Sequence, residues 1–273
     1  MVGAGFVSGT TVLWAELRRG QVDEAVSVGA TVLLPIGAIE QHGPHLPLNL
    51  DSVAATQVCV RAARSAAELP MLVLPTIAWG LSPYWMGFAG TITLRPEVLL
   101  AVVTDICTSV GHHGFSRLVI VNGHSGNEGL LQGTAGAAST PEFRVAVVSY
   151  WNLARAAVPE SAGPDGGIIG HAGETESSIA LFLQPELVDL SAVAAAQCVE
   201  IPIARRSFAA RAAVYESPNP ALDAPHGVYG QATSATAERG GRFIAAAADG
   251  LVQLVREFRG SGKPVGPATR VGP

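Results

Sequence analysis

Charged side chains are scarce in this sequence. Asp, Glu, Lys and Arg together make up 14% of the 273 residues, whereas hydrophobic residues make up 48%. The formal net charge is −5, and no segment concentrates lysine or arginine. Binding to nucleic acid through phosphate contacts is therefore not expected. A chain of this size with so few charges is expected to bury part of its surface in a homo-oligomer.

Long apolar runs and closely spaced cysteines are also missing. No run approaches the roughly 20 residues that a membrane-spanning helix needs, so no membrane partner is expected. The first ten residues lack the basic start and long apolar stretch of a signal peptide. The three cysteines, Cys59, Cys107 and Cys198, lie far apart among apolar residues. This usage is typical of reduced core cysteines and favours a cytoplasmic location.

Two common catalytic motifs are absent as well. The chain has neither the Gly-Xaa-Ser-Xaa-Gly elbow of serine hydrolases nor a glycine-rich phosphate loop with lysine. The sequence instead contains three short clusters of histidine and carboxylate, at residues 40–51, 122–127 and 170–178.

Strand-like and helix-like segments alternate along the chain. We expect strands at residues 32–36, 70–76, 118–121 and 144–149. We expect helices at residues 51–67, 96–111, 174–183 and 234–258, with one more after Asn127. This alternation predicts an α/β fold with a mostly parallel sheet and helices on both faces. We predict a single domain over residues 1–259 and a flexible Gly/Pro-rich tail over residues 260–273.

The first cluster follows directly on a predicted buried strand. Glu40 and His42 are two residues apart, so in an extended segment both side chains lie on one face. Asp51 comes nine residues after His42, where a helix begins. An oxygen ligand, an imidazole and a carboxylate able to bridge suit half of a two-metal site. The structural alternative is that Glu40 is an ion-pair partner, Asp51 a helix cap and His42 a loop histidine.

The second and third clusters supply further candidate ligands. His124 follows the third predicted strand, and because ligand sites gather at the carboxyl ends of parallel strands, it is the expected fourth ligand. Glu176 shares the apolar face of its helix, whereas Glu174 does not, so Glu176 is the candidate that faces the metals. His171 precedes this helix and is the candidate for proton transfer. The alternative is that both glutamates only complement the helix N-terminus.

The three clusters, in this order, resemble the creatininase family of metal-dependent amidohydrolases. The resemblance rests on Glu40-Gln41-His42-Gly43-Pro44-His45-Leu46-Pro47 with Asp51, on Asn122-Gly123-His124 and on the segment from His171 to Ser177. The segment from Gly87 to Leu94, and Gly227-Val228-Tyr229-Gly230 with Ala235-Thr236-Ala237-Glu238, also fit. Together with the flanking segments, these motifs span about residues 14–255.

The resemblance implies a three-layer α/β/α sandwich, two divalent metal ions (Zn, Mn or Fe) per chain and a homo-oligomer, possibly a hexamer. It implies that Glu40 and His124 are ligands of one metal and His42 of the other, with Asp51 as the bridge. His171 resembles the residue that handles protons near the bridging water, and Glu176 a further acidic ligand with a part in catalysis.

The chain departs from the family where substrate is expected to lie. Creatinine-hydrolysing members place a metal-binding glutamate at the position of Gly126, and that role is expected to pass to Glu176. Many members carry Glu-His or His-His where this chain has Tyr84 and Trp85, and a proline where it has Ala89. We expect contacts to substrate from Tyr84, Trp85, Trp151, His45 and Ser125, and leave His226 open.

The expected activity is hydrolysis of a C–N bond in a small amide or cyclic amide by a metal-activated water. Within the family, the alternatives are a peptidase of the mycofactocin-maturation type and a formamide hydrolase acting on a pyrimidine. A metal-binding scaffold without catalytic activity is the alternative from another class.

Overall fold

A parallel sheet forms the centre of the molecule. The computed structural model describes residues 11–157, 170–195 and 224–261. Within them, the sheet has four strands in the order β2-β1-β3-β4, and every neighbouring pair is parallel. The strands are β1 (Thr31–Ile36), β2 (Met71–Val73), β3 (Arg117–Asn122) and β4 (Arg144–Ser149).

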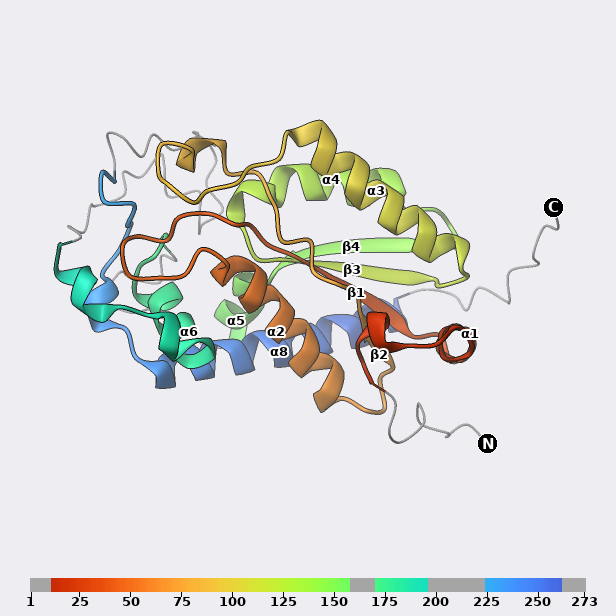
Figure 1. Ribbon diagram of the computed structural model, residues 1–273. Helices are drawn as coiled ribbons and strands as arrows, with labels where there is room; N and C mark the ends of the chain where they lie inside the picture. The colour runs from red at the N-terminus through yellow and green to blue at the C-terminus, as the bar shows by residue number, and fades with distance from the viewer. Residues whose placement is uncertain (1–10, 158–169, 196–223, 262–273) are drawn as a thin grey trace.

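Helices cover both faces of this sheet, which gives the three layers expected (Figure 1). On one face lie α3 (Pro96–His112) and α4 (Glu128–Ala138). On the other lie α2 (Leu50–Ser65), α5 (Tyr150–Ala157), α6 (Glu174–Leu183) and α8 (Ala237–Gly260). The short helix α1 (Arg19–Ser27) adds Ala25 to the half of the core that also contains residues of α3. No helix in these described segments is long and apolar enough to cross a membrane.

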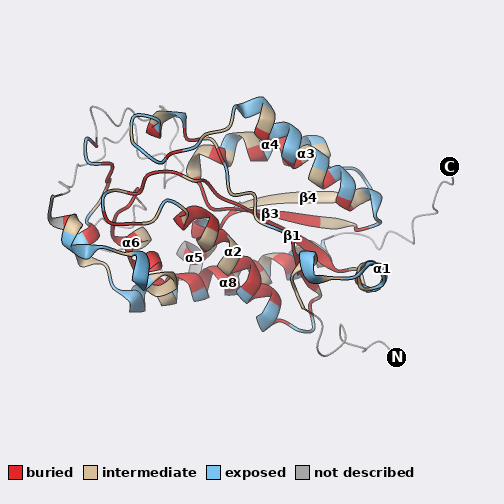
Figure 2. Ribbon diagram, in the orientation of Figure 1, coloured by how far each residue is buried: buried red, intermediate tan, exposed pale blue. Residues whose placement is uncertain are grey.

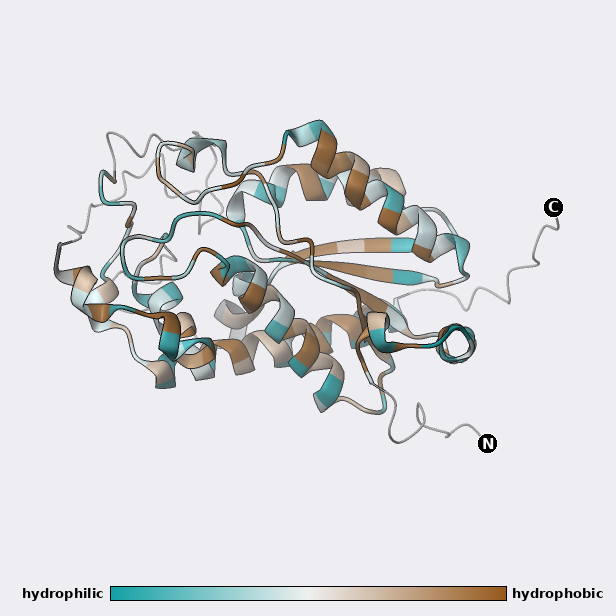
Figure 3. Cartoon of the chain, in the orientation of Figure 1, coloured by the Kyte–Doolittle hydropathy of each residue, from teal (hydrophilic) through white to brown (hydrophobic). Residues whose placement is uncertain are grey.

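Successive side chains of each strand point to opposite faces of the sheet, so the sheet divides the core into two halves. Val32, Leu34 and Ile36 of β1 point to the α3 side, and Leu33 points to the α2 and α8 side. Both faces are covered, so β1 is buried along its whole length, as the colouring of Figure 2 shows. The strands are accordingly apolar over most of their length in Figure 3, as is typical of parallel sheets.

Proline in a central strand normally costs a ladder hydrogen bond. Pro35 avoids this cost because β2 ends at Val73, which pairs with Leu33, and does not continue beside Pro35. The carbonyl of Pro35 accepts a hydrogen bond from the Ile77 N–H instead. The proline therefore lies beyond the last paired residues of β1 and β2.

The strand order indicates where on the sheet a ligand site is expected. The chain builds β2 on one side of β1 and then returns to build β3 on the other side, so the order reverses between β1 and β3. Ligands of open α/β sheets bind at the carboxyl ends of the strands at such a reversal. The loops that follow β1 and β3 carry Glu40, His42 and His124.

The predicted elements agree with the structure except at some ends. The strand predicted at 70–76 is limited to β2, and the last helix begins at Ala237 rather than at residue 234. It begins there because the Thr236 side chain caps it, accepting a hydrogen bond from the Arg239 N–H. Cys198 and nearly all of the predicted tail lie outside the described residues.

Candidate metal centre and active site

Side chains from three separate parts of the chain meet at the carboxyl end of the sheet. Nitrogen and carboxylate atoms within 4.8 Å of one another form three overlapping groups: Glu40, His42 and His171; Glu40, Asp51 and His124; and His42, Asp51 and Glu176. Every member except Glu176 is a buried residue, and the side chain of Glu176 is 14% exposed. The sequence-predicted ligands and the predicted proton-transfer residue therefore occupy one place.

Asp51 lies between two histidines. Its Oδ1 is 3.1 Å from Nε2 of His42, and its Oδ2 is 3.1 Å from Nδ1 of His124. The interpretation of Asp51 as a helix cap is wrong, because α2 begins at Leu50 with Asn49 at the N-cap. Gly123 permits this approach: its backbone lies against the Asp51 carbonyl, leaving no room for a side chain. A carboxylate with one oxygen toward each imidazole can bridge two cations.

The outer nitrogens of His42 and His124 are occupied by backbone carbonyls. Nδ1 of His42 lies 3.1 Å from the carbonyl oxygen of Glu40, and Nε2 of His124 lies 2.9 Å from that of Leu81. A carbonyl only accepts, so these nitrogens carry the proton in the neutral rings. The inner nitrogens then present lone pairs to the carboxylates. Metal-ligating histidines are held in this way.

Glu40 has one oxygen with nothing to bind among the described residues. Its Oε1 lies 3.3 Å from Nδ1 of His124 and 3.5 Å from Nδ1 of His171. Its Oε2 is buried and has no hydrogen-bond partner in the described part of the chain. An unpaired buried carboxylate oxygen is costly, and a bound cation would remove that cost. The donors fit Zn or Mn, which accept imidazole and carboxylate ligands.

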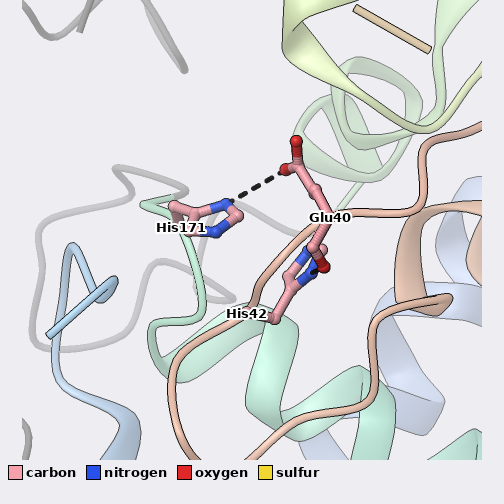
Figure 4. Close-up of side chains that lie close together, drawn as sticks. All are labelled: Glu40, His42 and His171. Atoms are coloured by element: carbon pink, nitrogen blue, oxygen red, sulfur yellow. Dashed lines mark hydrogen bonds and ion pairs between the residues drawn. The ribbon is translucent and has the colours of Figure 1, made fainter. Parts of the chain in front are cut away.

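His171 is held from several sides. Its ring stacks on the ring of Trp85 (centroids 4.3 Å apart) and contacts the tilted ring of His42 (4.5 Å). Its backbone exchanges two hydrogen bonds with Tyr229. Figure 4 shows its Nδ1 directed at the Glu40 carboxylate. The next residue, Ala172, has a φ of 53°, a strained value for a residue with a side chain.

The two glutamates of α6 have different surroundings. Oε2 of Glu176 lies 3.8 Å from Nε2 of His42 and accepts a hydrogen bond from the Ala172 N–H. Glu174 faces away from the centre, where its Oε1 lies 3.0 Å from Nη1 of Arg239. Glu176 is thus the glutamate of this pair placed with the candidate ligands.

The ionisable groups of the centre shift one another's pKa values. Burial alone would lower the pKa of His42, but Asp51 outweighs it and raises that pKa to about 10. Burial raises the pKa of Glu176 to about 7, with His42 opposing and Asp51 adding to the rise. Burial, and then the charge on His42, hold the pKa of His171 well below its ordinary value. Protons on His42 and Glu176 offset the negative charge of the carboxylates, as a bound cation would. Metal binding should therefore release these protons.

Of the residues predicted to contact substrate, Trp85, Trp151 and Ser125 line a pocket over the centre. The remaining lining residues are Glu40, Asp51, Gly123, His124, Gly170, His171 and Glu176.

The other predicted contacts lie elsewhere. Tyr84 is half-buried, and its hydroxyl lies 3.4 Å from Nε2 of His124 rather than on the pocket wall. His45 is buried, bonds Oγ of Ser177 at 2.8 Å and does not line the pocket. His226, which we left open, is exposed. Neither His45 nor His226 is therefore placed to contact a ligand in this pocket.

Sequence reasoning missed Gln41. Its side chain is hydrogen-bonded to Gly43, Gly227 and His171. Alternation along an extended segment turns it away from Glu40 and His42, so the ligand pattern gave no signal for it. Its position between two candidate ligands was the only available clue.

Comparison with known proteins identifies relatives of this fold and site. The creatininase family model, described as creatinine amidohydrolase, matches residues 15–255. A creatinine amidohydrolase from Pseudomonas putida is 31% identical over 266 residues, covering 90% of this chain and 97% of that protein. A mycofactocin precursor peptide peptidase from Mycobacterium ulcerans (strain Agy99) is 35% identical over 253 residues, covering 89% and 91%.

Solved structures agree with this assignment. A mutant creatininase of the Zn-Zn type matches with a TM-score of 0.77 and 28% identity, over 92% of this chain and 99% of that one. A creatininase described with Mn matches with a TM-score of 0.71 and 29% identity, over 91% and 99%. The family model and both kinds of relative span nearly the whole chain, and this protein therefore belongs to the creatininase family of hydrolases.

Proposed function

We propose that this protein is a metal-dependent amidohydrolase that cleaves a C–N bond in a small amide or cyclic amide with an activated water. The observation that carries the proposal is Asp51, whose two carboxylate oxygens each lie 3.1 Å from a different histidine, His42 and His124. Glu40, Asp51 and His124 would hold one divalent ion, and His42, Asp51 and Glu176 would hold the other. Zn and Mn are the expected metals, since related structures are described with them.

The protein's own groups then have distinct tasks. When bound, the metal ions supply Lewis acidity and lower the pKa of a water. His171 takes a proton on Nδ1 and delivers it to the departing nitrogen, because that atom faces the centre beside Glu40 and Glu176. Trp85 and Trp151 line the pocket with flat apolar surfaces, which exclude water and suit a planar substrate.

A second candidate function is peptidase activity on a short peptide. It is favoured by the 35% identity to the mycofactocin precursor peptide peptidase, and it uses the same centre. The two functions differ in the substrate that the pocket admits. A small cyclic amide needs only the buried pocket, whereas a peptide must also extend past its rim.

One substrate panel separates the candidates. Purified protein is incubated with lactams, cyclic ureas, formamides and short peptides, before and after chelation and metal restoration. Cleavage of small amides that chelation abolishes and metal restores is the expected result. Cleavage of peptides alone would replace the first proposal with the second. No cleavage by metal-loaded protein would favour the scaffold without catalytic activity.

We also propose that the chain forms a homo-oligomer. Large apolar side chains stand exposed beside the site loops, among them Trp79, Met86 and Ile92, each about half exposed. Burial of such residues between subunits would lower the free energy of association. Light scattering coupled to gel filtration gives the mass, and a monomer mass would contradict this proposal.

A further inference from the structure

Asn127 stands at the N-cap of α4, but its side chain does not cap that helix. Asparagine is favoured at this position because its side-chain oxygen can accept a hydrogen bond from a backbone N–H of the first turn. Here the residue is fully buried, and that oxygen accepts a hydrogen bond from Leu81 instead. The side chain of Asn127 therefore serves contacts outside its own helix.

Hydrogen bonds of this side chain reach three different segments of the chain. Its Oδ1 accepts from the Leu81 N–H at 2.9 Å, and its Nδ2 donates to the carbonyl oxygen of Gly37 at 3.1 Å. The same Nδ2 donates to Oδ1 of Asn122 at 3.3 Å. A backbone N–H only donates and a carbonyl only accepts, so these partners fix the orientation of the amide.

Two of these partners hold His124. The side chain of Asn122 accepts from the His124 N–H at 3.1 Å and donates to its carbonyl oxygen at 2.7 Å. The carbonyl oxygen of Leu81 lies 2.9 Å from Nε2 of His124. Asn127 is thus linked to the backbone of His124 through one residue and to its ring through another.

The third partner begins the loop that carries Glu40. Gly37 directly follows β1, and a Cβ at Gly80 would lie 2.6 Å from both its carbonyl oxygen and Oδ1 of Asn127, which leaves no room for a side chain. β1 and β3 lie side by side in Figure 1, so the loops that follow them leave the same edge of the sheet. A shift of either loop would change the 3.3 Å distance between Oε1 of Glu40 and Nδ1 of His124.

We propose that Asn127 is a positioning residue that sets the spacing of Glu40 and His124, and with it the affinity for the ion proposed between Glu40, Asp51 and His124 (the His124 ion). The inference deepens the proposed function and rests on it for the two metal ions. The candidate ligands of the other ion (the His42 ion) come from the loop after β1, from α2 and from α6. Loss of Asn127 should therefore weaken the His124 ion far more than the His42 ion.

Metal affinity tests the inference without a substrate. Protein freed of metal by chelator is titrated with Zn by calorimetry and with Co, whose visible absorption reports its ligands. The binding step that is lost in His124→Ala identifies the His124 ion. In Asn127→Leu, which removes every hydrogen bond of this side chain, the His124 ion should bind about 10–100-fold more weakly and the His42 ion should change less than about threefold.

Matched variants separate positioning from stability. Leu131 lies on the same helix, is fully buried and belongs to the core on the α3 side of the sheet. Leu131→Ala should lower the unfolding temperature and leave both affinities as in native protein. If Asn127→Leu does not fold, Asn127→Asp takes its place, because it keeps the acceptor for the Leu81 N–H and loses both donors. It should show the same selective loss.

Two results would overturn the inference. One is native affinity for both ions in the Asn127 variants, and the other is an equal loss of both ions. Failure of the proposed function looks different. A native protein that binds two ions and cleaves nothing, with the selective loss in Asn127→Leu, supports the role of Asn127 and removes only the reaction.

Discussion

Replacing Glu176 by glutamine is expected to have opposite effects on the metal-free and the metal-loaded protein. Burial raises the pKa of Glu176 to about 7 from an ordinary 4.5, with His42 opposing and Asp51 adding to the rise. The folded pKa lies above the unfolded one, so metal-free protein loses stability as pH rises from 4.5 to 7. Above pH 7 the loss is complete and amounts to about 3 kcal/mol.

Glutamine removes that cost but also removes a ligand. Its amide oxygen can still accept the hydrogen bond from the Ala172 N–H that the Glu176 carboxylate accepts. At pH 8 with chelator, Glu176→Gln should therefore unfold at a higher temperature than native protein, by on the order of 5–10 °C. With Zn in excess, native protein should gain stability by mass action, about 4 kcal/mol at 1,000 times Kd. The variant should gain much less.

Glu174→Gln is the matched control on the same helix. Oε1 of Glu174 pairs with Arg239 at 3.0 Å, and its side chain is 4% exposed. Its loss should lower the free energy of unfolding by about 1–3 kcal/mol with or without metal, and leave metal binding unchanged. Thermal unfolding of the native protein and the two variants, followed by circular dichroism at pH 8 with chelator and with Zn, gives the unfolding temperatures to be compared. Full metal stabilisation of Glu176→Gln, together with loss of metal from Glu174→Gln, would refute the reasoning.

Two further predictions concern residues beside the centre. Burial, and then the charge on His42, lower the pKa of His45 to about 4, below its unfolded 6.5. The free energy of unfolding is therefore unaffected by His45 above pH 6.5 and falls by about 3 kcal/mol as the pH drops to 4. In urea unfolding measured over this pH range, His45→Gln should show a smaller fall than native protein does. Gly126→Ala would place a Cβ 2.5 Å from Nε2 of His124, so calorimetry should show weaker metal binding. Gly129→Ala, with open space around it, should bind as native protein does.

The sheet could be predicted from sequence because parallel strands buried on both faces are apolar throughout. The strand at residues 144–149 and the helix at 174–183 have the predicted bounds. β2 is shorter than the apolar run that predicted it, since pairing with β1 ends at Val73. Strand ends depend on which neighbour is present, and local composition does not contain that information.

The candidate ligands could be selected because their spacing and their strand positions converge on one edge of the sheet. The apolar face of one helix favoured Glu176 over Glu174, and the structure places Glu176 with the candidate ligands. Burial is not what separates the two, because Glu174 is the more deeply buried and pairs with Arg239 instead. His45 and Gln41 could not be assigned in this way. Their partners, Ser177 and Gly227, are 132 and 186 residues away, and only the folded chain brings them together.

Metal content tests the central claim most directly. The purified protein is stripped with chelator, restored with Zn or Mn, freed of excess metal and measured by elemental analysis beside Asp51→Asn. We predict about two ions per native chain, and a loss in the variant that affects both of them, because Asp51 is a candidate ligand of each proposed ion. Folded native protein that retains no metal after restoration, or an Asp51→Asn variant that still binds two ions, would contradict it.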